Sequence, residues 1–436
     1  MSEKRQRQQQ RRQQRKTQAR ARSARAGRER RSPLGRESEE AELLAGIAEI
    51  ASRDAHEPDD ALDAEQWASC MLGTLDVRAM PGQDMLAMFI PGFVAALEDL
   101  GTPAALATLR ALGAVCRPDH APLARGAADR LADAGLAEPA WADDLGRATP
   151  TSALLMYEEA FDDGVSVIVE FTSPGVETHT LGIYIDHNMG GLVKDIFLAG
   201  PLSEVREHMN GAPDHAALAF RDLDLGEARA RVEAALYMLD HTWDPPVNED
   251  VPSMRALVEA RMRVLPDGVE LPDEHVEITL EEREELLEDF LSSPEGQRWR
   301  DDEDAEDVAE LAISFGADYN HGGPLRWSPV VVEIFMLDWL PRKVTREPGF
   351  FDRVSDVLRD WVKYAGRRQR VPAALLREAV GAVKDYREDM LDAVNDPEAW
   401  GPAKAFAAAA LDAGVDLADP EQVEEFVARY NDGLAA

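Results

Sequence analysis

Between residues 37 and 149, apolar residues recur at every third or fourth position, which is the spacing of helices that bury one face. The clearest example begins at Thr102-Pro103, because a threonine side chain can cap a helix and proline suits the first helical position. The apolar face of this helix consists of Leu106, Leu109, Leu112 and Cys116. Arg110 points away from that face. The pattern predicts several short helices rich in Ala and Leu.

The period changes to two between residues 151 and 200. Such alternation is typical of strands that bury one face, and glycine-containing turns separate the segments that show it. The predicted strands lie at 165–171, 180–186 and 192–198, and the turns lie at 173–175 and 188–191. The pattern predicts a three-stranded antiparallel meander with at least one helix packed on it.

Residues 202–436 return to the helical period. Thr279 and Glu282 form a capping box, in which each side chain satisfies a backbone N–H at the start of an acidic helix. Ser328, which is followed by a proline, starts another helix. We expect this second helix to end at Pro341, because the residue before a proline is disfavoured in the helical conformation.

Together these patterns predict an α+β protein that is predominantly helical, with one small antiparallel β-meander of about three strands. A length of 436 residues is typical of two to three domains. The chain is expected to comprise a disordered basic tail (1–36), a helical domain (37–150), a β-meander domain of the α+β type (151–225) and an acidic helical domain (226–436).

Charge is divided unevenly along the chain. Residues 1–36, the basic tail, hold 14 Lys or Arg and two acidic residues, or +12, whereas the other 400 residues hold 33 basic and 81 acidic residues, or −48. The tail has too few apolar residues to fold, and its charge attracts the nucleic-acid phosphates that the acidic remainder repels. The predicted nucleic-acid contacts are Arg11, Arg12, Arg15, Lys16, Arg20 and Arg22.

The sequence predicts a soluble, cytoplasmic protein without membrane contact. The longest apolar run, Met85 to Leu97, has 13 residues and contains a Pro-Gly pair, whereas a membrane span needs about 20. Cys70 and Cys116 lie on apolar faces of predicted helices, which favours buried, reduced thiols. The motifs of nucleotide-binding loops, zinc proteases and serine hydrolases do not occur, so no cofactor is identified.

The second turn of the meander holds the candidate site. We expect His187 to face Leu192 across the turn. Tyr184 then lies opposite Asp195, which is about 7–8 Å diagonally from Asp186. Two carboxylates and an imidazole suit a metal ion or acid–base chemistry, so we predict a metal site of Asp186, His187 and Asp195. The alternative is an ordinary turn on a solvated strand face.

A second segment, GPLRWSPVVVEIFMLDWLP, sets two acidic residues among apolar ones. Glu333 and Asp338 either form a buried ion pair with Arg326 or Arg342 that lines a pocket, or lie at the rim of an ordinary core helix. Burial without a partner would raise the pKa of either carboxyl group.

A third segment interleaves cations with Trp361 and Tyr364. Its cations are Arg359, Lys363, Arg367, Arg368 and Arg370. This combination is found in surfaces that bind nucleic acid or phosphate. The alternative is a helix end whose cations favour the helix dipole and pair with acidic neighbours.

Two stretches carry a resemblance to known proteins. HTLGIYIDHNMGGLVKD with the preceding DGVSVIVEF, and SPVVVEIFMLDWLP with the helix around Trp361, resemble uncharacterised cytosolic proteins of high-GC actinobacteria. The resemblance extends from about residue 60 to residue 395. That group has no assigned activity, cofactor or catalytic residue, so the resemblance implies domain extent and carries no functional residue across.

The leading expectation is a non-enzymatic interaction protein, whose acidic body recognises an unknown protein partner. Its basic tail either contacts nucleic acid or folds back on the acidic body at low salt. The alternative is an enzyme or metal-dependent domain that uses the polar face of the meander. The sequence does not decide whether the protein is an enzyme.

Overall fold

The computed structural model describes residues 33–53, 58–75, 85–211, 218–272, 277–346, 348–415 and 419–434. The chain divides into two compact units. The first unit contains the described residues as far as Thr149, with Thr172–Thr178 and Glu249–Val264, and the second contains Pro150–Phe171, His179–Asn248 and the described residues from Leu265 onward. The segment expected to form one acidic helical domain, 226–436, therefore contributes to both units.

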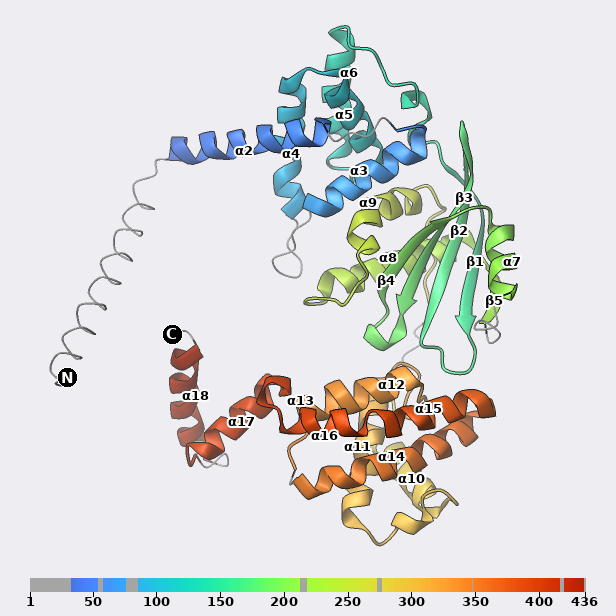
Figure 1. Ribbon diagram of the computed structural model, residues 1–436, viewed down its shortest axis with the longest axis vertical. Coiled ribbons are helices and arrows are strands. Elements are labelled where there is room, and N and C mark those ends of the chain that lie inside the picture. Colours follow the sequence, from blue (N-terminus) through green and yellow to red (C-terminus); the bar gives the residue numbers. More distant parts are fainter. Residues whose placement is uncertain are drawn as a thin grey trace, which may run out of the picture. The chain divides into compact units, whose positions relative to one another are not determined.

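The first unit is helical (Figure 1). Its elements are α2 (Pro33–Arg53), α3 (Ala61–Leu75), α4 (Met85–Leu100), α5 (Pro103–Val115), α6 (Ala121–Asp133), the 3-10 turn η1 (Ala142–Asp144) and α9 (Asp250–Met262). Helix α5 has the predicted start, because the Thr102 side chain accepts a hydrogen bond from the backbone N–H of Ala105 at 3.1 Å. Its predicted apolar face is buried, and Arg110 forms surface ion pairs.

Helix α9 packs against α3 although it lies far along the chain. Gly73 of α3 approaches α9 so closely that a Cβ atom would lie 2.2 Å from the carbonyl oxygen of Pro252. Arg261 of α9 forms an ion pair with Glu65 of α3 at 2.6 Å, and each side chain is 4% exposed. Glycine permits the close packing, and the buried ion pair joins the two helices.

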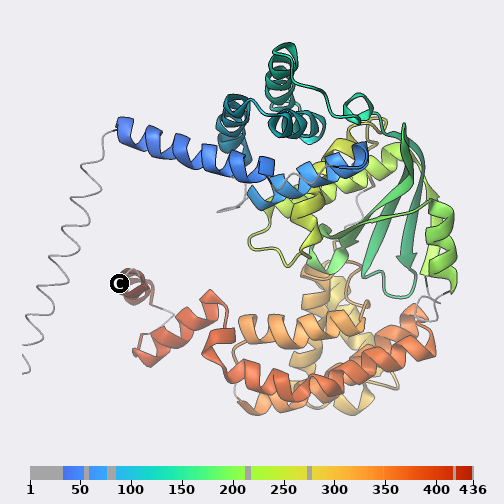
Figure 2. The same ribbon diagram turned by 45° about the horizontal axis from the view of Figure 1, so that its top comes forward.

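The second unit contains most of an antiparallel sheet of five strands in the order β4-β3-β2-β1-β5. The strands are β1 (Thr149–Glu158), β2 (Gly164–Ser173), β3 (Val176–Asp186), β4 (Leu192–Ala199) and β5 (Leu218–Leu223). Helix α7 (Leu202–Gly211) covers one face and α8 (Leu225–His241) packs against β4, so both faces of the sheet are covered (Figures 1 and 2). The predicted α+β class is confirmed.

The predicted number of strands is wrong, because β1 and β5 were missed. Strand β1 buries four consecutive residues, from Ala153 to Met156, and therefore lacks a period of two. A continuous apolar run of this length does not distinguish a strand buried on both faces from a helix. Strand β5 is a short edge strand that pairs with β1 from Ala153↔Leu223 to Glu158↔Leu218.

The predicted pairing of β3 with β4 is confirmed for most of its length, including Ile183↔Ile196 and Tyr184↔Asp195. A β-bulge between Tyr184 and Ile185 then shifts the register, so that Asp186 and not His187 lies opposite Leu192. His187 instead begins a 3-10 turn, η2 (His187–Met189), that the Asp186 side chain caps. The bulge admits one extra residue and re-aims the side chains that follow it.

Most of the remaining helices of the second unit bury an aromatic-rich core, and the last two bury a small separate one. They are α10 (Leu280–Ser292), α11 (Glu303–Asp318), α12 (Pro329–Glu333), α13 (Leu340–Lys343), α14 (Pro348–Gln369), α15 (Ala373–Asp385), α16 (Arg387–Asn395), α17 (Pro402–Asp412) and α18 (Pro420–Leu434), with short turns η4 (Gln297–Trp299) and η6 (Pro397–Ala399). The predicted capping box of Thr279 and Glu282 is confirmed at the start of α10.

The helix that begins after Ser328 does not end at Pro341 as predicted. A π-helical segment, η5 (Ile334–Trp339), follows α12, and α13 continues to Lys343 with Pro341 in its first turn. The backbone N–H of Leu340 reaches the carbonyl oxygen of Phe335, five positions back. Proline is tolerated here because α13 restarts one residue before it, where its missing N–H has no helical partner to lose.

Three further predictions concern the basic tail, the two cysteines and membrane spans. The six predicted nucleic-acid contacts, from Arg11 to Arg22, lie outside the described residues, and α2 begins at Pro33. Cys116 is buried as predicted, but Cys70 is exposed. No helix among the described residues is long and apolar enough to span a bilayer.

Candidate metal site

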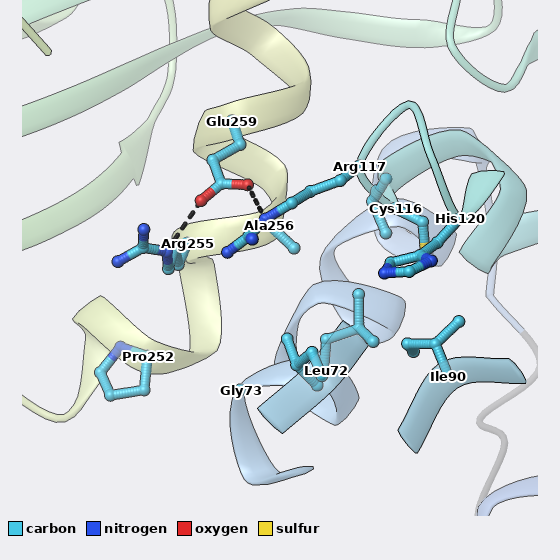
Figure 3. A pocket seen from close by; sticks show the side chains of 12 residues that line it. Leu72, Gly73, Ile90, Cys116, Arg117, His120, Pro252, Arg255, Ala256 and Glu259 are labelled. Carbon is cyan, nitrogen blue, oxygen red and sulfur yellow. Dashed lines mark hydrogen bonds and ion pairs between the residues drawn. The ribbon is translucent and has the colours of Figure 1, made fainter. Parts of the chain in front are cut away.

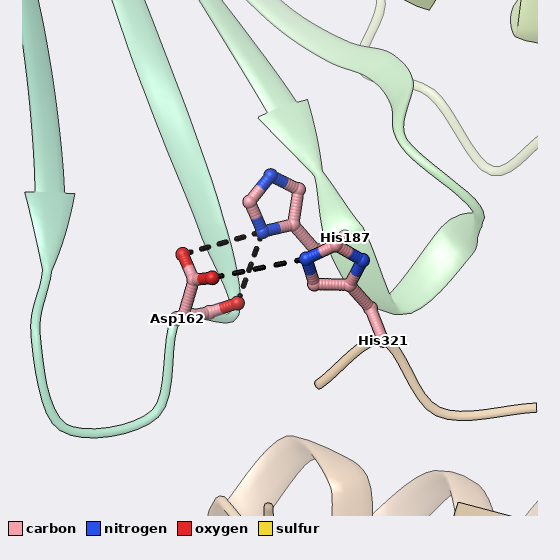
Figure 4. A group of neighbouring side chains, drawn as sticks. All are labelled: Asp162, His187 and His321. Atoms are coloured by element: carbon pink, nitrogen blue, oxygen red, sulfur yellow. Dashed lines mark hydrogen bonds and ion pairs between the residues drawn. The ribbon is translucent and has the colours of Figure 1, made fainter. Parts of the chain in front are cut away.

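Three loops of the second unit bring one carboxylate and two imidazoles together (Figure 4). Asp162 lies in the loop between β1 and β2, His187 directly follows β3, and His321 lies in the loop between α11 and α12. One potential ligand atom from each side chain lies within 4.8 Å of the others. Among the described residues, these three make the one group of at least three such side chains that converges in this way.

The spacing of these atoms is close to that of a coordination sphere. Nδ1 of His187 lies 3.3 Å from Oδ1 of Asp162, and Nε2 of His321 lies 3.8 Å from Oδ2 of Asp162. Ligand atoms at about 2.0–2.1 Å from a tetrahedral metal lie roughly 3.3 Å apart. The side chain of His187 is 9% exposed, that of His321 29% and that of Asp162 47%, so the group opens toward solvent on one side.

Arg326 connects the three loops. Its guanidinium donates hydrogen bonds to the carbonyl oxygens of Phe161 (2.9 Å) and Asp162 (3.2 Å), to the side chain of Asn188, and to the carbonyl oxygen of His321. Its side chain is only 6% exposed. One buried residue therefore binds the backbone of two potential ligands, Asp162 and His321, and the side chain of Asn188 beside the third, which is the usual function of groups that surround a metal site.

Asp163 neutralises this buried arginine. Its Oδ1 accepts hydrogen bonds from Arg326 (2.8 Å), Ser328 (2.7 Å) and Asn188 (3.0 Å). Burial lowers the pKa of Arg326, and the charge of Asp163 acts in the opposite direction. The same serine accepts a hydrogen bond from the N–H of Val331, so the start of α12 is tied to the site.

The backbone of Asp162 adopts a left-handed conformation, with φ of 52°. Non-glycine residues are uncommon in this region and need support from their surroundings. The carbonyl oxygen of Asp162 lies 3.1 Å from Nδ1 of His187 and accepts a hydrogen bond from Arg326. These contacts hold the Asp162 side chain beside both histidines.

The electrostatic environment of His187 is dominated by two opposing effects. Burial acts to lower the pKa of His187, but the hydrogen bond and negative charge of Asp162 outweigh it, so the pKa lies above the ordinary value. Burial also raises the pKa of the neighbouring Tyr184 to about 12, so this phenol stays protonated. The proton that His187 attracts in this way would compete with a metal ion for the same imidazole lone pair.

Two cavities adjoin the three side chains. The wide cavity, of about 550 Å³, is lined by both histidines and by residues of α8 and of the loop after α11. The narrow cavity, of about 390 Å³, is lined by Asp162, His187 and residues of β1 and β5. Val165, His187 and Arg231 line both. A small molecule in either cavity would reach the group of potential ligands.

The structure does not gather the predicted set of Asp186, His187 and Asp195. The Asp186 carboxylate is 3% exposed, bonds to Lys194 at 2.5 Å and caps the turn through the N–H of Asn188. Asp195 lies opposite Tyr184 and bonds to its neighbour's backbone N–H. His187 begins the 3-10 turn after the register shift, and Asp162 and His321 are the residues that group with it.

Sequence reasoning missed Asp162 and His321 because both lie in loops without a regular period. The local signals are weak: Asp162 belongs to an Asp-Asp-Gly turn, and His321 precedes two glycines. Those glycines have positive φ values, 83° at Gly322 and 80° at Gly323, which a turn of this kind requires. The two residues are brought together only by tertiary packing.

In the other two candidate segments, most of the charged side chains contact neighbouring side chains. Asp338 pairs with Arg342 at the surface, and Glu333 accepts a hydrogen bond from Tyr386. In the basic segment, the aromatic rings of Trp361 and Tyr364 are buried. Four of its cations pair with acidic residues: Arg359 with Asp356, Lys363 with Asp360, Arg367 with Glu295 and Arg368 with Asp289.

A hollow in the first unit also gathers reactive side chains (Figure 3). Its volume is only about 30 Å³, which suits a single water molecule. Burial raises the pKa of Cys116 to about 12, so its thiol is a poor nucleophile. Arg117 and Arg255 both bind the Glu259 carboxylate, at 3.3 and 2.8 Å. This hollow is therefore a weaker candidate than the histidine pair.

Comparisons with family models, with curated proteins and with solved structures gave no match to this chain. The chemistry of the site is therefore the basis on which a function can be assigned.

Proposed function

We propose that the protein binds a divalent transition-metal ion through Asp162, His187 and His321. The observation that carries this proposal is the convergence of one carboxylate and two imidazole nitrogens within 4.8 Å. Imidazole suits Zn²⁺, Fe²⁺, Co²⁺ and Ni²⁺, whereas Ca²⁺ and Mg²⁺ favour oxygen ligands. The buried arginine that holds the three loops supports the proposal, because metal ligands need rigid surroundings.

With three protein ligands, at least one coordination position of the ion stays open for water or for a small molecule. An ion in such a site can polarise a bound group or lower the pKa of a bound water. The wide and narrow cavities adjoin the three ligands and give a small molecule room to reach the ion. The proposed function is thus metal-dependent binding of a small ligand at the end of the sheet, with hydrolytic chemistry as its natural extension.

The test is a series of thermal melts of protein first stripped with EDTA, in Zn²⁺, Co²⁺, Mn²⁺ or Ca²⁺. A bound ion raises the melting temperature because it binds the folded state alone. We expect a rise with Zn²⁺ or Co²⁺, little change with Ca²⁺, and loss of the rise in His187→Ala and in His321→Ala.

The matched control is His241→Ala. His241 belongs to the same unit but lies outside the group, and its Nδ1 bonds to the carbonyl oxygen of Tyr237 in its own helix. This variant is expected to retain the full response to the ion. If His187→Ala responds as the unchanged protein does, the ion binds elsewhere and the proposal is wrong.

The charge division of the chain favours a second candidate function, tethering to nucleic acid by the basic tail. Full-length protein is compared with a variant in which the six cations from Arg11 to Arg22 are replaced by Gln. Each phosphate contact adds roughly 0.9 to the slope of log affinity against log salt on duplex DNA. We expect the variant to bind mixed-sequence duplex more weakly and with a shallower slope, and equal slopes would exclude tethering by these residues.

A further inference from the structure

The first unit contains a cavity of about 610 Å³ whose lining includes no residue of the candidate metal site. Its wall is formed by α3 with the two residues 58 and 59 before it, by the first half of α5 with its cap, and by the segment that leads from α6 to η1. A volume of this size lies within the range of cavities that enclose small organic ligands, roughly 300–1,000 Å³.

Two tryptophans belong to the wall, Trp67 of α3 and Trp141 directly before η1. Trp141 is 8% exposed and lies in the core of the first unit, and Trp67 is partly buried against the same core. No cation of the described residues lies over either ring. An indole attracts a cation to its face more strongly than any other side chain ring does, so two indoles in one wall favour a positively charged ligand.

The three segments that form the wall carry an excess of negative charge. Residues 58–75, 102–115 and 137–147 contain seven acidic residues and two cations. Both cations, Arg110 and Arg147, are held in ion pairs with carboxylates. Among the described residues, no cation pairs with four of the acids, which are Asp59, Asp60, Asp63 and Asp143. The local charge therefore disfavours an anion in the cavity and favours a cation.

The wall offers few groups that could accept a hydrogen bond from a ligand. Apart from the indoles, its polar side chains are Asp59, Thr102 and Thr108, and the rest of the wall is alanine and proline. Thr102 accepts a hydrogen bond from the N–H of Ala105 at 3.1 Å, and Thr108 donates one to the carbonyl oxygen of Ala104 at 2.8 Å. A primary ammonium carries three N–H donors that lose water on burial, whereas a quaternary ammonium has none. The wall therefore suits the quaternary form.

Asp59 is the one acidic residue of the wall. Its two neighbours at the start of α3 have structural tasks: Asp60 accepts a hydrogen bond from the N–H of Asp63 at 2.9 Å, and Asp63 accepts one from the N–H of Asp59 at 3.1 Å. Asp59 precedes Trp67 by about two helical turns, or about 11 Å, and helical side chains lean toward the N-terminus of their helix. The carboxylate thus lies at the end of α3 toward which the indole extends, and its attraction for a cation acts at long range.

From this wall we infer that the cavity binds an organic quaternary ammonium ion, whose charged head lies against the indoles and whose apolar substituent lies against the alanine and proline residues. The inference does not depend on the proposed metal site, because no residue is common to the two. Trp67 and Trp141 are the binding residues, and Asp59 adds a weaker electrostatic attraction.

The test is calorimetric titration of the full chain with four probes: hexyltrimethylammonium, tetramethylammonium, hexylammonium and hexanol. We expect one hexyltrimethylammonium ion per chain, bound at least tenfold more tightly than tetramethylammonium, since each buried CH₂ group contributes about fourfold. Hexanol lacks the charge and should bind at least tenfold more weakly than hexyltrimethylammonium. Hexylammonium should bind at least threefold more weakly, because its N–H groups lose water without gaining acceptors.

Variants identify which part of the wall binds the charge. Trp67→Leu keeps the wall apolar but removes the indole, so affinity for hexyltrimethylammonium should fall at least fivefold while that for hexanol stays within about twofold. Trp67→Phe should restore part of the loss. Asp59→Asn should weaken hexyltrimethylammonium binding about threefold and leave hexanol unchanged.

Matched controls come from residues outside the wall. Trp243 is 64% exposed and belongs to the second unit, and Asp133 is an exposed acid at the end of α6. Trp243→Leu and Asp133→Asn are each expected to bind all four probes as the unchanged protein does.

Several results would overturn the inference. Equal affinities for hexyltrimethylammonium and hexanol would show an apolar site without preference for charge, and tighter binding of hexylammonium would exclude the quaternary form. Absence of binding, or binding of many ions without saturation, would mean that the cavity is no cation site. A loss in Trp243→Leu as large as that in Trp67→Leu would place the bound ion elsewhere.

Discussion

The two units each contain a cluster of ionisable groups, and the clusters differ in where their partners come from. In the first unit, Glu65 binds Arg261 at 2.6 Å and accepts a hydrogen bond from the N–H of Gly146 at 2.7 Å, with both charged side chains almost fully buried. In the second unit, His187 and His321 converge on Asp162 at the edge of two cavities. The first cluster is closed, and the second has an open side.

This difference separates a structural role from a functional one. A carboxylate whose hydrogen bonds are all made inside the protein contributes to stability and leaves no site for a ligand. The two imidazoles and the carboxylate of the second cluster instead lie at the edge of two cavities, where an ion or a small molecule can reach them. Whether an ionisable residue faces a cavity is thus a better guide to a functional role than how deeply it is buried.

The largest effect is expected from breaking the closed cluster. Glu65→Ala leaves the buried charge of Arg261 without its carboxylate, which should lower the free energy of unfolding by about 4 kcal/mol. Denaturant titration followed by circular dichroism measures this change. The control is Glu98→Ala, which breaks the surface ion pair with Arg130 and should cost under about 1 kcal/mol. Equal losses in the two variants would contradict the distinction between closed and exposed pairs.

The next largest effect is expected at Arg326, a buried residue that makes its hydrogen bonds inside the protein beside the candidate metal ligands. Arg326→Lys keeps the charge but cannot reach the three loops at once, so stability should fall by about 3 kcal/mol and the response to Zn²⁺ should disappear. Arg342→Lys, at a surface ion pair with Asp338, is the control and should change stability by less than about 0.5 kcal/mol. Retention of the Zn²⁺ response in Arg326→Lys would show that the loops hold their positions without it.

The open cluster alone should respond to an ion. At 100 times the dissociation constant, Zn²⁺ should stabilise the second unit by about 2.7 kcal/mol. Hydrogen exchange measured by mass spectrometry should show slower exchange at residues 160–163, 187–191 and 319–327, and no change around Glu65 and Arg261. Slower exchange at both clusters would mean that the ion does not act at the histidines.

The smallest effect on stability is expected from the titration of Glu227, which belongs to neither cluster. Its pKa is lowered in the folded state by Arg221, so its contribution to stability is present above the ordinary carboxyl pKa and is lost as the pH falls through the lowered value. The difference in unfolding free energy between the unchanged protein and Glu227→Gln should therefore be constant near neutral pH and shrink below about pH 4.5. A difference that grows as the pH falls would contradict the assigned direction.

The sequence predicted the elements whose patterns are local. Thr102 and Ser328 mark helix starts, and the alternation in β2 and β3 marks strands, because these signals depend on neighbours along the chain. Strand β1 was missed because burial on both faces removes the alternation. The end of the helix at Pro341 was misplaced because a π-helical turn has no recognised local pattern.

Only one member of the candidate site, His187, was predicted from the sequence. Asp186 was chosen because the predicted register sets it diagonally from Asp195, but Lys194 neutralises it, and the register shifts at a bulge after Tyr184. Asp162 and His321 lie in different loops, and the distance between them depends on how helices α11 and α12 pack at the end of the sheet. Such contacts are properties of the tertiary structure and have no equivalent in a single sequence.

The position of Arg326 in the chain has a consequence for biosynthesis. Its partners Asp163 and Asn188 precede it by 163 and 138 positions, so on the ribosome their loops emerge long before the arginine that fixes them. Domains generally fold as units during synthesis, with the N-terminal part first. The sheet of a nascent chain can therefore form while the histidine pair is still incomplete, and affinity for an ion would mark the moment at which the later helices have joined it.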